Sequence, residues 1–138
     1  MDKLEYIPRD LVSVYVGIKK YIVEVIGTEN ENEALLYQIK FPNREIQYAD
    51  KDNIVPIPLT PEILEKNGWV KDTHRHCLDE MPAEAYEKKD FPLTHFNVTF
   101  GKKRIQASHD CLFVRNLKYV SDLQHLLFGL GLNSEMEV

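Results

Sequence analysis

The side chains best suited to chemistry are histidines and cysteines, three of which lie in one polar stretch. His74, His76 and Cys77 lie within four residues, and the other members are spread along the chain at His95, His109, Cys111 and His125. Imidazole and thiolate are zinc ligands, but zinc fingers and ribbons space them as Cys-x-x-Cys and His-x-x-x-His pairs. Neither spacing occurs, so we predict no metal site, no cofactor and no stoichiometric zinc.

The sequence His109-Asp110-Cys111 places a thiol two residues from a histidine, and a nucleophilic thiolate needs a nearby base. On a strand, His109 and Cys111 share one side, whereas Asp110 faces the other. Cys111 also opens an apolar run, where a small buried hydrophobe fits. We therefore predict no catalytic residue and no cofactor-binding residue, and a metal- or thiol-dependent enzyme is the least favoured alternative.

The sequence contains neither a calcium-binding loop nor a phosphate-binding loop. Glu29, Glu31 and Glu33 alternate with other residues but lack the glycine and spacing of a calcium loop, so they predict a solvated acidic loop. No glycine-rich loop of the phosphate-binding kind joins a strand to a helix. The sequence thus indicates binding in preference to catalysis.

Two segments are candidates for binding a partner. The first is the polar stretch from Lys71 to Pro92, because long irregular segments inside compact domains are often functional. Its candidate partner-binding residues are Tyr86, Phe91, His74 and His76. The second is the basic turn Lys102-Lys103-Arg104, which is a candidate contact for nucleic-acid phosphates.

The elements that position these residues are mostly strands. Apolar residues alternate with polar ones over residues 11–16, 21–26 and 35–41, with a further short strand near 45–48. The acidic residues 27–33 predict a loop, and the prolines at 56 and 58 predict an edge strand or a linker. Short antiparallel strands at this spacing indicate a small curled sheet or an SH3-like barrel.

A short helix follows, and its ends are well specified. Thr60 is the predicted N-cap, Pro61 occupies the first helical position, and Gly68 ends the helix. Trp69 then packs back on Leu64, so we expect it to be buried.

The C-terminal half combines strands with a second helix. Residues 83–89 suit either one or two helical turns or a loop, whereas residues 96–100, 105–107 and 111–114 have the pattern of strands. Ser121 and Gln124 form a predicted capping box. The apolar stripe of the last helix is Leu123, Leu126, Leu127 and Leu130. The predicted fold is α+β, with a β-rich subdomain over 1–58 and an α+β subdomain over 59–138, packed as one unit.

Composition supports a folded, cytoplasmic protein. The chain has 138 residues, 43% hydrophobic and 28% charged, which is near the globular average. Two cysteines make no disulfide framework, and we expect neither a signal peptide nor a membrane span. The net charge of -5 disfavours unspecific nucleic-acid binding, although it allows a local basic patch.

Two segments resemble an uncharacterised family of small proteins from phages, prophages and mobile elements of gut anaerobic bacteria. One segment is Ile57-Pro58-Leu59-Thr60 followed by Leu64 and Gly68-Trp69. The other is the terminal helix around Leu123-Gln124-His125-Leu126-Leu127-Phe128. The chain departs from the family pattern at Trp69, Ser121, His125 and Gly129. The resemblance implies a shared fold and origin but no activity.

These observations favour a non-enzymatic accessory protein of a phage or mobile element that binds another macromolecule. An unknown protein is the preferred partner, and no membrane partner is expected. The alternative is a nucleic-acid-contacting module that uses the basic turn. The sequence leaves the oligomeric state open.

Overall fold

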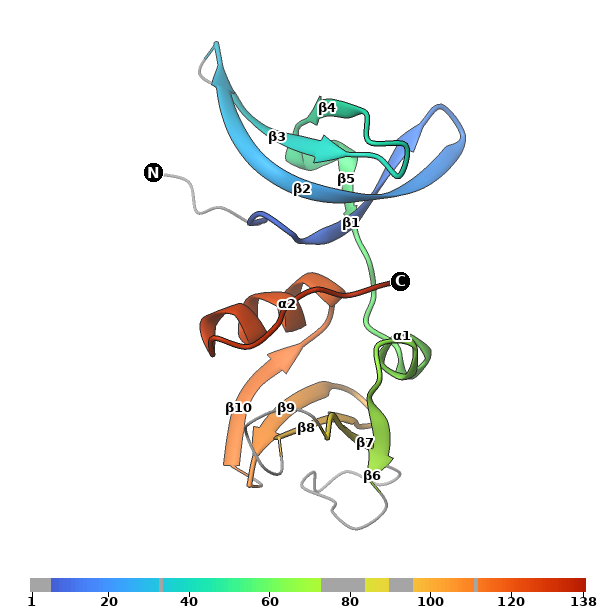
Figure 1. Ribbon diagram of the computed structural model, residues 1–138, viewed down its shortest axis with the longest axis vertical. Coiled ribbons are helices and arrows are strands. Elements are labelled where there is room, and N and C mark those ends of the chain that lie inside the picture. Colours follow the sequence, from blue (N-terminus) through green and yellow to red (C-terminus); the bar gives the residue numbers. More distant parts are fainter. Residues whose placement is uncertain (1–5, 33, 73–83, 90–95, 111) are drawn as a thin grey trace. The chain divides into compact units, whose positions relative to one another are not determined.

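The computed structural model describes residues 6–32, 34–72, 84–89, 96–110 and 112–138 (Figure 1). The chain divides into two compact units, one formed by Met1–Pro58, Tyr119–Met136 and Val138, the other by Leu59–Lys118 and Glu137. Within the described residues, each unit contains a five-stranded antiparallel sheet and one α-helix, which gives the α+β fold that the sequence predicts. The sequence pattern grouped the last helix with residues 59–118, whereas its contacts belong to the first unit.

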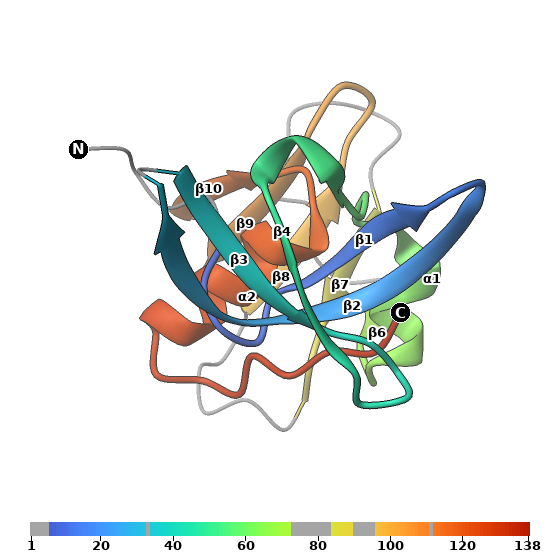
Figure 2. The ribbon, with the colours of Figure 1, turned by 90° about the horizontal axis from the view of Figure 1, so that it is seen from above.

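The first unit is a curled sheet with the order β4-β3-β2-β1-β5. Its strands are β1 (Leu11–Val16), β2 (Lys19–Glu31), β3 (Ala34–Lys40), β4 (Ile46–Ala49) and β5 (Ile54–Pro56), and the 3₁₀ turn η1 (Lys51–Asn53) lies between the last two. Seen from above, β2 sweeps along the whole curve of the sheet (Figure 2). Gly17, with φ of +65°, provides the tight turn between β1 and β2.

Strand β2 is longer than the sequence predicts. We expected an acidic loop over residues 27–33, but β2 continues to Glu31 and pairs with β3, so that prediction was wrong. The register shifts between Val25 and Gly27, which is where the long strand can bend. A side chain at Gly27 would approach the Gln38 side-chain oxygen to 3.1 Å, so the close approach favours glycine there. Main-chain pairing with β3 thus makes residues 27–31 a strand although their composition is polar.

The concave face of this sheet carries the hydrophobic core of the first unit. The buried side chains are Tyr6, Val12, Val14, Val23, Val25, Tyr37, Ile39, Phe41 and Ile54. Apart from Tyr6 and Phe41, they come from alternate positions of neighbouring strands, as the period-two pattern requires. Tyr6 packs edge-on against Tyr37 at a ring-centroid distance of 5.4 Å.

Helix α2 (Val120–Gly129) also belongs to the first unit. It begins one residue after Tyr119, whose main-chain N–H donates to the Asp122 carboxylate at 2.8 Å. The predicted Ser121–Gln124 capping box was therefore wrong, because Ser121 is already inside the helix and buried. Of the predicted stripe, Leu123 and Leu127 are buried and Leu130 is exposed.

The second unit begins with helix α1 (Pro61–Lys66), whose predicted ends are confirmed. The Thr60 hydroxyl accepts the Ile63 N–H at 3.3 Å, and Gly68 has a left-handed φ of +86°. The Trp69 N–H donates to the Leu64 carbonyl at 3.0 Å, and both side chains are buried. Local sequence was sufficient here because every cap contact lies within one turn of the helix.

The sheet of the second unit runs in the order β10-β9-β8-β7-β6. Its strands are β6 (Val70–Asp72), β7 (Glu84–Glu87), β8 (Phe96–Phe100), β9 (Ile105–His109) and β10 (Leu112–Leu117). The alternative of helical turns over residues 83–89 was wrong, because Glu84–Glu87 pairs with strands on both sides. One face of this sheet packs Phe96 against Trp69, with ring centroids 6.3 Å apart.

Candidate functional site

The histidine and cysteine candidates fall mostly outside the described residues. His74, His76, Cys77, His95 and Cys111 lie there, as does Phe91. The remaining two histidines are on separate units, His109 at the end of β9 and His125 in α2. Within the described ranges, no three His, Cys, Asp or Glu side chains gather as a metal site.

Tyr86, a candidate for partner binding, lies on the packed side of the second sheet. Its side chain is 3% exposed, and its ring packs edge-on against Phe100. The hydroxyl donates to the Glu65 carboxylate at 3.4 Å. Burial, together with the charges of Glu84 and Glu65, raises the pKa of Tyr86 above its ordinary value. These contacts give Tyr86 a place in the core and leave its ring little surface for a partner.

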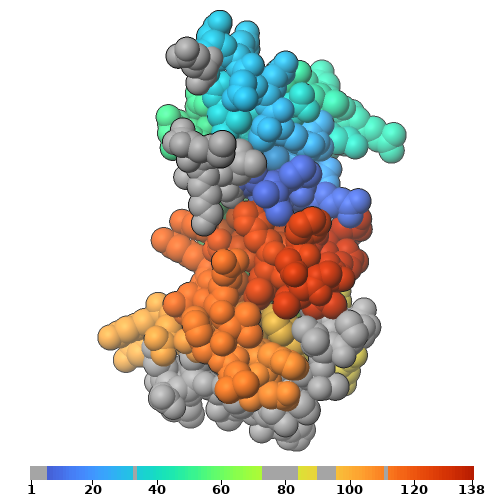
Figure 3. All heavy atoms as spheres, turned by 90° about the vertical axis from the view of Figure 1, so that its left-hand side faces the viewer, coloured from blue at the N-terminus to red at the C-terminus, as the bar shows by residue number. Residues whose placement is uncertain are grey.

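The basic turn Lys102-Lys103-Arg104 is exposed between β8 and β9. The Gly101 N–H donates to the Arg104 carbonyl at 2.8 Å, which closes the turn. In Figure 3, light-orange atoms of this part of the chain project from the surface. The turn is thus closed by a main-chain hydrogen bond, and its three side chains are exposed.

The strand register adds two more cations to this turn. Leu117 of β10 lies opposite Ile105, so Lys118 follows beside Arg104. Arg115 lies opposite Ala107, two residue pairs further along the same two strands. Both side chains are exposed. We call Lys102, Lys103, Arg104, Arg115 and Lys118 together the basic end of the second sheet.

Charge is strongly segregated along the chain. Residues 96–118 contain five Lys and Arg residues and one Asp, a formal charge of +4, whereas the whole chain carries -5. The remaining residues therefore sum to -9. A local positive field on an acidic protein attracts anionic groups to one place while the rest of the surface repels them.

Strand β10 also carries exposed apolar side chains, which begin at the opposite end of the strand from the basic turn and continue to the residue before Arg115. Leu112, Phe113 and Val114 are 73%, 59% and 39% exposed, and β10 is an edge strand. The register shifts between Phe113 and Arg115, which identifies a bulge. Phe113 lies two residues from Arg115 on this strand, so an aromatic ring and one cation are available to a ligand there.

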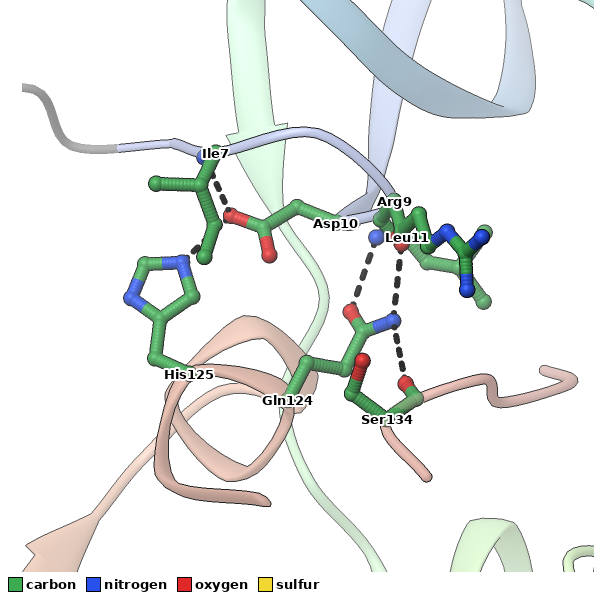
Figure 4. Close-up of polar contacts among 7 residues, drawn as sticks. All are labelled: Ile7, Arg9, Asp10, Leu11, Gln124, His125 and Ser134. Atoms are coloured by element: carbon green, nitrogen blue, oxygen red, sulfur yellow. Dashed lines mark hydrogen bonds and ion pairs between the residues drawn. The ribbon is translucent and has the colours of Figure 1, made fainter. Parts of the chain in front are cut away.

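The first unit has a polar cluster that the sequence did not reveal (Figure 4). Asp10, only 1% exposed, accepts the Ile7 N–H at 3.0 Å and contacts His125 Nε2. Gln124 accepts the Leu11 N–H at 2.8 Å and donates to the carbonyls of Arg9 and Ser134. The only sequence signal was the position of Gln124, which we had assigned to a helix cap.

An aspartate–histidine pair can orient a general base, as it does in hydrolase triads. Among the described residues, however, no hydroxyl or thiol is hydrogen-bonded to the His125 ring, so a nucleophile is not in place there. The neighbouring contacts instead join α2 to the segment before β1. The arrangement therefore links α2 to residues 7–11.

The chain matches no protein-family model, no curated protein and no solved structure at a significant level. No helix in the described part of the chain is long and apolar enough to cross a membrane.

Proposed function

We propose that this chain is a cytoplasmic, non-enzymatic binding protein of a phage or mobile element, and that it contacts nucleic acid through the basic end of the second sheet. The segregated charge carries the proposal. Five exposed cations lie around one turn and the adjoining end of one strand, in a protein that is otherwise acidic. The resemblance to mobile-element proteins supports the proposed origin.

The chemistry of the basic end suits a phosphate backbone. Lysine and arginine neutralise phosphates and release counterions, which gives affinity without base specificity. Phe113 lies on the strand that also carries Arg115, so an unpaired base could stack beside an ionic contact. We therefore expect single-stranded nucleic acid to bind more tightly than duplex.

A second candidate function is protein binding by the first unit, which we propose to be an SH3-like barrel. Its strand order and the 3₁₀ turn before β5 support this assignment. Four large side chains on the convex face of the sheet are 42–55% exposed, namely Tyr15, Ile22, Ile46 and Tyr48. Exposed aromatic and aliphatic side chains that share one face are typical of protein-binding surfaces.

Fluorescence anisotropy with labelled single-stranded and duplex oligonucleotides, measured at several salt concentrations, tests the nucleic-acid proposal. The Lys102→Ala/Lys103→Ala variant should bind more weakly. Its salt slope should be shallower by about 1.4 for single strands, since each phosphate that is no longer neutralised removes roughly 0.7. The matched control is Lys19→Ala/Lys20→Ala, which removes two exposed lysines from the β1–β2 hairpin. It should leave affinity unchanged.

Equal weakening by the two double variants would show that only overall charge matters, and the proposed surface would be rejected. If neither oligonucleotide binds at low salt, the protein-binding candidate takes its place. Capture of a defined host or phage protein that Tyr15→Ala or Tyr48→Ala abolishes would support that candidate.

A further inference from the structure

The second sheet buries a polar face as well as an apolar one. Strand register places Asp72, Ala85 and Thr99 in one row across the sheet, and Glu87, Asn97 and Ser108 in the next row on the same face. Asn97 and Thr99 are each 1% exposed and Ser108 is 4% exposed. Alternation of these residues with Phe96, Val98 and Phe100 would ordinarily predict a solvated face. The polar side chains are buried instead.

Three oxygen atoms on this face have no hydrogen-bond partner among the described residues. They are Asn97 Oδ1, Thr99 Oγ1 and Ser108 Oγ. Each buried and unpaired polar group costs about 1–3 kcal/mol in folding free energy, so three on one face are unexpected in a purely structural core. Because Asn97 lies directly opposite Ser108 and two residues from Thr99, the three oxygens belong to one neighbourhood.

Asp72 fixes the orientation of the central amide. Asn97 Nδ2 donates to Asp72 Oδ2 at 3.1 Å, so the amide oxygen is left as the acceptor without a donor. Directly opposite Asp72, β7 carries the small side chain of Ala85, which leaves room for Asp72 on β6 to reach across to β8. This geometry is that of an outer carboxylate that orients an inner oxygen ligand.

Glu87 supplies a second carboxylate. It lies directly opposite Asn97 in the β7–β8 register and is half-buried. The face therefore combines a carboxylate, an amide oxygen and two hydroxyl oxygens, with Asp72 behind them. Oxygen ligands of this kind are preferred by hard cations, whereas zinc prefers nitrogen and sulfur.

We propose that this face binds one divalent cation, calcium or magnesium, through Glu87, Asn97, Thr99 and Ser108. The Glu87 carboxylate would offset part of the charge of the ion, as burial of a cation requires. With so few charged ligands the affinity should be moderate, on the order of 0.1–1 mM, and water would complete the coordination. The cation would satisfy the three oxygens that lack partners.

Thermal unfolding of EDTA-treated protein with added calcium or magnesium tests the site. The midpoint is compared between protein in 10 mM calcium and protein in 10 mM magnesium. With the ion that the site binds, it should be higher by about 5 °C or more. Thr99→Val, which keeps the side-chain shape, and Ser108→Ala should each remove most of that rise. Ser13→Ala is the matched control, because its buried hydroxyl already donates to the Val55 carbonyl at 2.9 Å. It should lower the midpoint and keep the response to the cation.

Terbium luminescence titration provides a second measurement, in which Thr99→Val and Glu87→Gln should each weaken binding by about tenfold or more. A midpoint that neither ion changes would overturn the proposal. So would a response that persists in both Thr99→Val and Ser108→Ala, since the ion would then bind elsewhere. These outcomes are independent of the nucleic-acid measurements, which concern different residues.

Discussion

Gln124 is the residue on which several main-chain groups of the first unit depend. Its amide bonds one N–H and two carbonyls from two separate segments, and its side chain is only 2% exposed. The Gln124 side chain thus bonds main-chain groups at Arg9 and Leu11 in the way that a neighbouring strand would. The neighbouring Asp10–His125 contact joins the same two segments.

Removing the Gln124 amide should therefore destabilise the first unit. Gln124→Ala leaves three main-chain groups without this partner, so the free energy of unfolding should fall by about 2–4 kcal/mol. Urea unfolding followed by circular dichroism measures the change. Gln47→Ala, which truncates an exposed side chain of the edge strand β4, is the control and should change stability by less than about 0.5 kcal/mol. Similar values for the two variants would contradict this role.

The raised pKa of Tyr86 predicts that the second unit loses stability at alkaline pH. Its pKa is raised in the folded state by burial first and by Glu84 and Glu65 next, so the folded chain holds the phenol proton more tightly than the unfolded chain. Stability is thus fully present below the ordinary value of 10.0 and falls as pH rises from there toward the folded pKa.

Tyr86→Phe should remove this fall. At pH 7 the variant should lose about 1 kcal/mol at most, because the hydroxyl's bond to Glu65 is long. Between pH 9 and 11, its stability should decrease less than that of the wild-type chain. Glu65→Gln, which removes one of the charges, should give an intermediate dependence. Parallel curves for all three proteins would contradict the assignment.

Among the elements, the ends of the two helices are specified in different ways. Helix α1 has all its cap contacts within residues 60–69, and the sequence predicted both ends. Helix α2 begins at a residue set by Asp122 and by the chain around Pro58, which pairs with Tyr119. A cap that depends on a distant segment cannot be recognised from local spacing.

Two glycines near helix ends should respond oppositely to alanine. Gly68 has φ of +86°, a conformation that costs a side chain about 1 kcal/mol, so Gly68→Ala should destabilise by that amount. Gly129 lies within α2, and a methyl group there would meet no atom within 4 Å. Gly129→Ala should therefore stabilise by about 0.5–1 kcal/mol. Thermal unfolding distinguishes the two signs, and destabilisation by both would refute the argument.

In the whole molecule, the first unit is discontinuous in sequence. Its sheet comes from residues before 58 and its helix from residues after 118. Val120, Leu123 and Leu127 are buried, so the helix contributes apolar contacts as well as the Gln124 hydrogen bonds.

Deleting residues 119–138 should therefore weaken β1, although the deleted residues are far from it in sequence. Hydrogen exchange measured by mass spectrometry should show faster exchange for the amides around Leu11, which no longer have the Gln124 partner. Deletion of residues 137–138 alone is the control. Unchanged protection around Leu11 in the longer deletion would show that α2 is not needed for the sheet.

Local patterns in the sequence were enough to specify the class of fold, most strands, and helix α1. Each of these depends on alternation or on cap residues that lie within a few positions of one another. The basic turn at residues 102–104 was also evident, because charge can be counted without knowing the fold. The candidate residues in 73–83 and 90–95 lie outside the described part of the chain.

Which residues share a site depended on the tertiary structure. Arg115 and Lys118 join the basic turn because β10 pairs with β9 in one particular register. Asn97, Thr99 and Ser108 look like solvent-facing positions in the sequence, and their burial depends on what covers the second face of the sheet. Residues 27–31 and 84–87 form strands because neighbouring strands provide hydrogen-bond partners for their main chain. The composition of these residues alone does not reveal that stabilisation, since it depends on segments elsewhere in the chain.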